Sequence, residues 1–492
     1  MDSTTELAAP IAVPHMTPEQ FREVGRRTVD RIADYMERVG EFPVRSRVAP
    51  GEVASALPAD APAQGEAWDD ILADIDRVVM PGITHWQSPR FFGYFPCNTT
   101  GPAILADMLS DALNAQGMMW STSPAVTEIE TRMLDWMGRA IGLPDAFLST
   151  SPSGGGVIQG TASESSLVCL LAARDRAVRS GRASSLDRMT VYTSTQAHSS
   201  IAKDARIAGI AEANIRLVPT DASYAMDAGA LARMMADDTA KGLAPIYICA
   251  TVGTTSSGAI DPVRAIVDAA RQHHAWVHVD AAYAAAAAIC PEFRAPLMDG
   301  VDDADSYVFN PHKWLLTTFD CSTLWVRNRK ALVDALSITP EYLRNAATDS
   351  GAVIDYRDWQ IPLGRRFRAL KLWFVMRNYG IDGLRAHIRE HVRLGALAES
   401  LVDADDRFER PAPRCLSLVT FRLKGDNART KTIMERVNAS GEAFFSHTIL
   451  PRVDGTPGEG LYTIRMAIGA TSVAESDVRR AWSAITREAD RV

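Results

Sequence analysis

The sequence predicts an α/β fold, in which a large domain with a mostly parallel sheet follows an N-terminal helical segment and precedes a small C-terminal α+β domain. Two observations support this prediction. Between about residues 145 and 330, short apolar and β-branched runs alternate with longer helical runs, which is typical of a sheet with helices on both faces. The 492 residues also exceed one ordinary domain of roughly 150 residues.

The N-terminal part is predicted to contain two helices. Residues 1–15 show no periodic pattern, so we expect them to be disordered. Thr17 has the features of a helix N-cap, and an apolar stripe at helical spacing follows it. A second amphipathic helix is predicted over Trp68–Val79. Because two such helices cannot bury both their faces alone, we predict that residues 16–100 form a dimerisation segment that packs on a partner subunit.

Residues 101–370 are predicted to form the large domain. The expected strands are Met189–Thr193, Ile246–Thr251, Ala275–Asp280, Tyr307–Phe309 and Thr323–Val326. The expected helices include Ser165–Arg179, Ala228–Asp238 and Pro262–His274. Ligands of such folds bind at the carboxyl ends of the strands, so functional side chains are expected directly after each strand.

Residues 371–492 are predicted to form the small α+β domain. The helical stretches are Arg366–Arg377, which begins just before it, and Leu384–Val402. The expected strands are Leu416–Leu423 and Leu461–Ala467, and the last expected helix is Glu475–Ala489.

Composition excludes several classes of protein. The net charge of 52 − 60 = −8 gives no general attraction to nucleic acid or anionic membranes. No apolar run approaches the roughly 18 residues of a membrane helix, and the N-terminus lacks the basic start of a secretory signal. The six scattered cysteines indicate reduced thiols, so we expect a cytoplasmic protein with no nucleic-acid or membrane partner.

The strongest local signal is Lys313, in the segment Asn310-Pro311-His312-Lys313-Trp314 directly after a predicted strand. Most lysines are solvated surface charges. A lysine at a strand end among apolar residues is different, because desolvation disfavours its ammonium form and makes the amine a nucleophile toward aldehydes. A Schiff base to a cofactor aldehyde is the natural use of such a residue.

Asp280 ends another predicted strand. Alone, it is as consistent with a helix cap or a buried paired acid. Together with Lys313, Asp280 indicates one particular cofactor, because pyridoxal phosphate requires a lysine for its aldehyde and an acid for its pyridine nitrogen.

A glycine-rich segment over residues 153–156 precedes Gly160-Thr161-Ala162-Ser163-Glu164 and a helix. A glycine-rich loop before a helix N-terminus offers free N–H groups to a phosphate, with Ala162 and Ser163 as the expected contacts. A plain turn explains the glycines equally well. His198, after the strand Met189–Thr193, suits an aromatic clamp over a cofactor ring, although a loop histidine with no such role explains it as well.

With these residues in place, the chain resembles the aromatic-L-amino-acid decarboxylases, which are group II pyridoxal-phosphate-dependent decarboxylases. The resemblance covers about residues 16–490, and its segments are FFGYFP, GGGVIQGTASES, QAHSS, HVDAAYA, ICPEFR, NPHKW and DYRDWQIPLGRRFRALKLWFV. It implies the fold-type I (aminotransferase-like) α/β fold, pyridoxal phosphate as cofactor, and a homodimer in which the N-terminal helices wrap the partner.

The resemblance also implies roles for individual residues. Lys313 would form the Schiff base, Asp280 would pair with the pyridine nitrogen and His198 would stack on the ring. Tyr342, in the segment EYLRN, would return a proton to the substrate carbon after carbon dioxide leaves. The other cofactor contacts would be Ala282 against the ring, Thr255 near cofactor and substrate, and Ala162, Ser163, Asn310 and His312 around the phosphate.

The implied reaction is decarboxylation of an aromatic L-amino acid to the arylalkylamine: tryptophan, 5-hydroxytryptophan, DOPA, tyrosine or phenylalanine. The side-chain pocket would contain Trp86, Tyr94, Phe95, Pro96, Met118 and Gly364. Relatives that make aldehydes by oxidative decarboxylation replace the loop tyrosine with phenylalanine or the stacking histidine with asparagine. Tyr342 and His198 therefore favour simple decarboxylation over an aromatic acetaldehyde synthase.

Other functions have to be weighed against decarboxylation of an aromatic amino acid. A glutamate or histidine decarboxylase of the same group is the main rival, but the matched pocket positions are aromatic and apolar. A non-catalytic protein of the same fold would be expected to lose Lys313, Asp280 or Tyr342. The segment His387–His391 fits the H-x-x-E-H zinc pattern, but we interpret it as a solvated, charged helix face and expect no metal site. Arg465 would bind the substrate α-carboxylate or only its own neighbours.

Overall fold

The computed structural model describes residues 15–338, 346–349, 352–453 and 458–492. Two compact units divide the chain after His85. In the first unit, α1 (Pro18–Arg38) starts from a capping box in which Thr17 and Gln20 exchange hydrogen bonds, as predicted for Thr17. The unit's other helices are α2 (Glu52–Ser55), α3 (Trp68–Asp74), a π-helical turn Ile75–Val79 and α4 (Met80–Gly82). Disorder was expected over residues 1–15, and residues 1–14 of these lie outside the described part of the chain.

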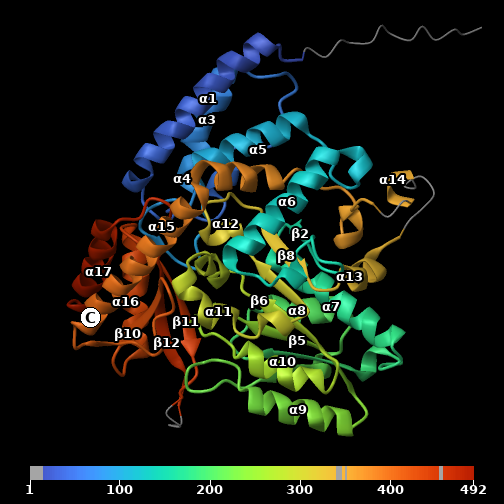
Figure 1. Ribbon diagram of the computed structural model, residues 1–492. Helices are drawn as coiled ribbons and strands as arrows, with labels where there is room; N and C mark the ends of the chain where they lie inside the picture. The colour runs from blue at the N-terminus through green and yellow to red at the C-terminus, as the bar shows by residue number, and fades with distance from the viewer. Residues whose placement is uncertain (1–14, 339–345, 350–351, 454–457) are drawn as a thin grey trace, which may run out of the picture. The chain divides into compact units, whose positions relative to one another are not determined.

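The second unit contains a seven-stranded sheet in the order β2-β8-β7-β6-β5-β3-β4 (Figure 1). Four of the pairings are parallel, and only β8 pairs antiparallel, with β2 and β7. The strands are β2 (Gly155–Gln159), β3 (Met189–Ser194), β4 (Ile215–Val218), β5 (Ala244–Thr251), β6 (Trp276–Asp280), β7 (Ser306–Phe309) and β8 (Ser322–Val326). The predicted mostly parallel sheet is confirmed.

Helices cover both faces of this sheet. One face packs against α7 (Ala162–Arg179), α8 (Ser200–Ile207) and α13 (Arg329–Leu336) through side chains such as Val191, Tyr247 and Trp276. The other packs against α6 (Pro124–Ile141), α9 (Ala228–Ala240) and α10 (Val263–Arg271). Further helices are α5 (Gly101–Leu113), α11 (Arg294–Met298), α12 (Pro311–Trp314), α14 (Ala346–Asp349) and the 3-10 segment Ala284–Ile289.

The glycine-rich segment is a strand and not the expected loop. Gly155 and Gly156 belong to β2, at the edge of the sheet beside β8. A Cβ atom on Gly155 would lie 2.8 Å from Cη2 of Trp359, and one on Gly156 would lie 2.8 Å from Cδ1 of Trp325. The glycines are therefore needed because two indole rings pack directly on the strand backbone.

A second, five-stranded sheet has the order β1-β11-β12-β10-β9. Its strands are β1 (Phe91–Phe92), β9 (Phe408–Glu409), β10 (Leu418–Leu423), β11 (Phe444–Leu450) and β12 (Leu461–Ala467). It packs with α15 (Ala369–Asp403), α16 (Asn427–Ser440) and α17 (Glu475–Ala489), as the orange and red part of Figure 1 shows. Gly380 interrupts α15 with a φ of 63°, at the break predicted between Arg377 and Leu384. Within the described residues, no helix is both long and apolar enough to span a bilayer.

Candidate active site

The sequence-predicted side chains meet at the carboxyl ends of the parallel strands. His198 follows β3, Thr255 follows β5, Asp280 ends β6 and Lys313 follows β7. They border one cavity of about 240 Å³. Its lining is Phe95, Thr161, Ala162, Ser163, His198, Ser200, Thr251, Gly253, Thr255, Asp280, Ala282, Tyr283, Asn310, His312, Lys313 and Phe319.

Lys313 lies in the one-turn helix α12 and reaches into this cavity, with Nζ 5.3 Å from the ring centre of Phe95. Burial lowers the pKa of its ammonium group; Asp280 opposes that shift and Arg465 reinforces it. A lysine whose neutral form is favoured can attack a carbonyl carbon. The apolar neighbourhood thus supplies the nucleophile that the sequence indicated.

Asp280 lies on the same sheet edge and is 6% exposed. Its Oδ1 accepts a hydrogen bond of 3.0 Å from the backbone N–H of Ala282, which fixes the carboxylate relative to the cavity wall. His198 is oriented through Nδ1, which accepts a hydrogen bond from the backbone N–H of Ser200 at 3.2 Å and lies 2.8 Å from Ser200 Oγ. Both side chains thus have fixed orientations at the cavity.

The opposite part of the lining is suited to an anion. Helix α7 begins at Ala162, and a capping box between Thr161 and Glu164 fixes its first turn. The free N–H groups of such a turn attract phosphate. Oδ1 of Asn310 and Oγ1 of Thr251 are buried and have no hydrogen-bond partner among the described residues. An amine, a carboxylate and an anion-binding turn around one cavity fit pyridoxal phosphate.

Arg465, on β12, lies outside the cavity lining but near the same Phe95 ring as Lys313. It is 2% exposed, and its Nη1 donates to the carbonyl oxygen of Tyr94 at 3.1 Å and to Ser446 Oγ at 2.8 Å. Within the described residues, its Nε and Nη2 have no partner. Its guanidinium carbon lies 5.2 Å from the ring centre of Phe95, and burial lowers its pKa to about 10.

Three aromatic rings stack in a row next to Lys313. Phe95 stacks on Tyr283 with ring centres 4.0 Å apart, and Tyr283 stacks on Trp314 at 4.9 Å. Trp314 Nε1 donates to His391 Nδ1 at 2.8 Å. The expectation of a solvated face over His387–His391 is wrong for His391, which is 2% exposed because it caps this stack. No group of three metal-ligating side chains is found among the described residues.

Of the side chains predicted for the substrate pocket, the structure places Phe95 in the cavity lining. Trp86, Tyr94, Pro96, Met118 and Gly364 lie outside that lining in the described structure. Trp86 and Tyr94 stack on each other with ring centres 5.5 Å apart, and both are exposed. Tyr342 lies outside the described residues.

The sequence did not single out six lining residues: Thr161, Ser200, Thr251, Gly253, Tyr283 and Phe319. Thr251 and Gly253 directly follow or end β5, so the rule that ligands lie at strand ends would have found them. Phe319 carries no such signal, because only the turn between α12 and β8 brings it to the cavity.

Comparison with known proteins agrees with this geometry. Residues 50–424 match the pyridoxal-dependent decarboxylase conserved domain. Tryptophan decarboxylase 2 of Oryza sativa subsp. japonica is 47% identical over 486 residues, covering 97% of this chain and 96% of that protein. Phenylacetaldehyde synthase of Arabidopsis thaliana is 46% identical over 483 residues, covering 96% of each.

The crystal structure of Oryza sativa TDC with PLP and tryptamine has a TM-score of 0.94 and 42% identity, and covers 98% of this chain and 99% of that one. The chain therefore belongs to the pyridoxal-dependent decarboxylases.

Proposed function

We propose that the protein decarboxylates an aromatic L-amino acid to the corresponding arylalkylamine and carbon dioxide. One observation supports this above all: Lys313, Asp280 and the N-terminus of α7 line a single cavity. Relatives named for decarboxylation of tryptophan and tyrosine point to the same substrate class.

When bound, pyridoxal phosphate supplies an electron-poor ring that accepts the electron pair left on the substrate Cα as carbon dioxide departs. Asp280 would hold a proton on the ring nitrogen, and Ala282 and His198 would contact the ring. Ala162, Ser163, Asn310 and His312 would hold the phosphate, and Thr255 would lie near cofactor and substrate. These are the functions that the cavity lining can perform.

Lys313 acts as the amine of the site. Its lowered pKa keeps a fraction of the amine neutral, so it can bind the cofactor aldehyde and exchange protons with the substrate amine. Arg465 has two nitrogens without a partner among the described residues and would hold the substrate α-carboxylate. Tyr342 returns a proton to Cα, and Trp86, Tyr94, Phe95, Pro96, Met118 and Gly364 select an aromatic side chain.

We further propose a homodimer. Helix α5 leaves Leu105, Leu109 and Leu113 about half exposed on one face, at 51%, 50% and 65%. Helix α1 has no buried residue. Apolar faces of this kind are typical of subunit contacts. Sedimentation of wild type and of Leu109→Arg tests this, with a monomeric wild type contradicting it.

We also propose that the protein is cytoplasmic. All six cysteines lie among the described residues and are unpaired, which supports a reducing compartment. Fractionation of cells that produce the protein tests this proposal. Recovery in a secreted or membrane fraction would contradict it.

Product analysis by mass spectrometry tests the reaction. Purified holoenzyme is mixed with tryptophan, 5-hydroxytryptophan, DOPA, tyrosine, phenylalanine, glutamate or histidine, and amine, aldehyde, peroxide and ammonia are measured. We expect arylalkylamine without peroxide. Aldehyde with peroxide and ammonia would establish an acetaldehyde synthase instead, the activity for which the Arabidopsis thaliana relative is named. Turnover of glutamate or histidine alone would overturn the aromatic pocket.

A further inference from the structure

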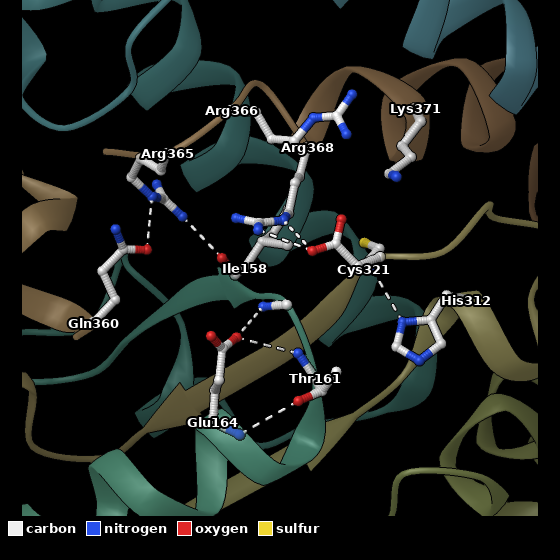
Figure 2. Close-up of polar contacts among 12 residues, drawn as sticks. Ile158, Thr161, Glu164, His312, Cys321, Gln360, Arg365, Arg366, Arg368 and Lys371 are labelled. Carbon is white, nitrogen blue, oxygen red and sulfur yellow. Dashed lines mark hydrogen bonds and ion pairs between the residues drawn. The ribbon is translucent and has the colours of Figure 1, made fainter. Parts of the chain in front are cut away.

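An ion pair lies directly behind the anion-binding side of the cavity. Arg368, the residue that caps α15, donates to Oδ2 of Asp320 from Nε at 3.0 Å and from Nη2 at 2.9 Å. The two side chains are only 17% and 20% exposed. Figure 2 shows Arg368 between the start of α15 and the turn that carries Thr161 and Glu164.

Asp320 brings a negative charge next to that turn. A Cβ atom on Gly160 would lie 2.6 Å from Oε2 of Glu164 and 3.2 Å from Oδ2 of Asp320. Oε2 of Glu164 already accepts from the N–H of Gly160 at 2.6 Å and of Thr161 at 3.3 Å. Two carboxylates thus converge where the helix begins, and both would repel a phosphate bound there. Arg368 neutralises one of them.

The same pair holds the chain next to His312. Asp320 precedes Cys321, whose backbone N–H donates to Nδ1 of His312 at 3.0 Å. A nitrogen that accepts an N–H carries no proton, so the neutral ring has its hydrogen on Nε2. Burial lowers the pKa of His312 to about 3, so the ring is neutral at physiological pH. His312 therefore offers one N–H donor at the cavity lining and no charge.

We propose that Arg368 and Asp320 are positioning residues for phosphate binding: their ion pair cancels a carboxylate charge beside Gly160 and holds Cys321 so that His312 presents its Nε2–H. This inference rests on the proposed cofactor site. It assigns a function to two residues that do not line the cavity in the described structure.

The chain offers a matched control two positions away. Arg366 pairs with Asp111 at 2.6 Å, and these side chains are 45% and 69% exposed. In Figure 2 its guanidinium group is directed away from Arg368 and His312. Arg366→Gln removes the same charge from the same segment without touching Asp320. A general loss of positive charge would affect both variants alike.

The test measures binding of inorganic phosphate and of pyridoxal phosphate to the apoenzyme by calorimetry. We expect Arg368→Gln to raise both Kd values about tenfold or more, as expected for an uncompensated charge near a bound anion. Adding Asp320→Asn to it should bring both within about threefold of wild type, and Arg366→Gln should leave them within about twofold. Asp320→Asn alone should keep phosphate Kd within about threefold of wild type, because it removes the carboxylate charge together with the contact to Arg368.

The direction in which each variant changes Kd distinguishes an effect of charge from a purely structural one. If the pair were only structural, Asp320→Asn would weaken binding as Arg368→Gln does, and the double variant would rescue nothing; either result overturns the proposal. Should Arg368→Gln fail to fold, Asp320→Asn and Arg368→Lys still decide. Both are expected to keep phosphate Kd within about threefold, because the first removes the negative charge and the second retains the positive one. A clear loss in Asp320→Asn would contradict the proposal.

Nitrogen chemical shifts of His312 provide a second measurement that does not depend on activity. In long-range proton–nitrogen spectra of the apoenzyme, we expect a neutral ring protonated at Nε2 in wild type and Arg366→Gln, and a mixture of tautomers in Arg368→Gln. An Nδ1-protonated or charged ring in wild type would overturn the inference. A wild-type apoenzyme that binds neither phosphate nor pyridoxal phosphate would instead overturn the proposed cofactor site, so the two failures are distinguishable.

Discussion

A buried guanidinium with two nitrogens that lack a partner among the described residues is costly unless an anion pairs with it. Arg465 is in this position, beside Lys313 and 2% exposed. If it holds the substrate α-carboxylate, Arg465→Met should raise KM about 10- to 100-fold, as for the loss of a hydrogen bond to a charged group.

The amine product provides the control for this prediction, because it lacks the carboxylate. Its inhibition constant should stay unchanged in Arg465→Met, and Arg465→Lys should recover part of the lost affinity for the amino acid. Steady-state kinetics with product inhibition measure both constants. Equal weakening of substrate and product would show that Arg465 only supports its neighbours.

Asp204 is a second unusual residue near the cavity. It is 4% exposed, and its Oδ2 has no partner among the described residues. Burial raises its pKa to about 7, although Lys203 opposes the shift. Because the folded-state pKa lies above the unfolded value, the contribution of Asp204 to stability falls as pH rises from about 4 to above 7.

Asp204→Asn should therefore stabilise the protein at pH 8, with a gain that shrinks toward pH 5. Urea unfolding at the two pH values measures this difference. Asp237→Asn, at an exposed position, serves as the control and should change neither value. A gain that is equal at both pH values would contradict the assignment of a buried charge.

Among individual residues, the sequence predicted much of the cavity lining. Lys313, Asp280 and His198 were singled out because each ends or follows a strand, and parallel strands bring their ends together, while Asn310 was implied by the family resemblance. Phe319 and Tyr283 were not predicted, because their approach depends on turns whose path the sequence pattern does not specify. The pairing of Arg368 with Asp320 likewise joins segments that no local pattern connects.

Among the elements, β2 is sensitive to substitution of its glycines. A Cβ atom on Gly156 would lie 2.8 Å from Cδ1 of Trp325 and 2.9 Å from the carbonyl oxygen of Leu324, and backbone cannot move aside as a side chain can. Gly156→Ala should therefore lower the free energy of unfolding by about 1–3 kcal/mol, in the range for overpacked sites.

Gly101 is the matched control for this change, because a Cβ atom there meets nothing within 4 Å at the start of α5. Gly101→Ala should be neutral or slightly stabilising. Thermal or urea unfolding compares the two variants. If they behave alike, the contact with Trp325 does not constrain the strand.

Element prediction succeeded where side chains carried the periodic signal. The expected strand Leu461–Ala467 and helix Glu475–Ala489 agree with β12 and α17 residue for residue. The strand β2 was missed because glycine has no side chain to give an alternating pattern, and its strand conformation comes from packing against Trp325 and Trp359.

For the whole molecule, buried neutral histidines determine the response to acid. His278 is fully buried, with Nδ1 2.8 Å from Ser306 Oγ and Nε2 3.3 Å from Ser166 Oγ. Burial lowers its pKa to about 4, and it lowers that of His387 similarly. At these histidines the unfolded chain binds more protons than the folded chain between about pH 4 and 6.5, so their contribution to stability is complete above 6.5 and falls below it.

His278→Gln should make the loss of stability between pH 7 and pH 5 smaller than in wild type, because one buried group no longer gains a proton on unfolding. The difference should be about 1–2 kcal/mol across this interval. Urea unfolding at both pH values measures it, and His15→Gln, at an exposed position, should leave the wild-type slope unchanged. An unaltered slope in His278→Gln would contradict this account.

The aromatic stack behind Lys313 also has an optical consequence. Trp314 is completely buried, directly follows the lysine in the chain and lies in ring contact with Tyr283, whose other neighbour Phe95 borders the cavity. If pyridoxal phosphate binds at Lys313, as proposed, it absorbs in the region where indole emits, and excitation of Trp314 would be transferred to it. Of the ten tryptophans, the one beside the lysine should be the most strongly quenched. The chain thus contains a fluorescent reporter of its own cofactor occupancy, readable without any added label.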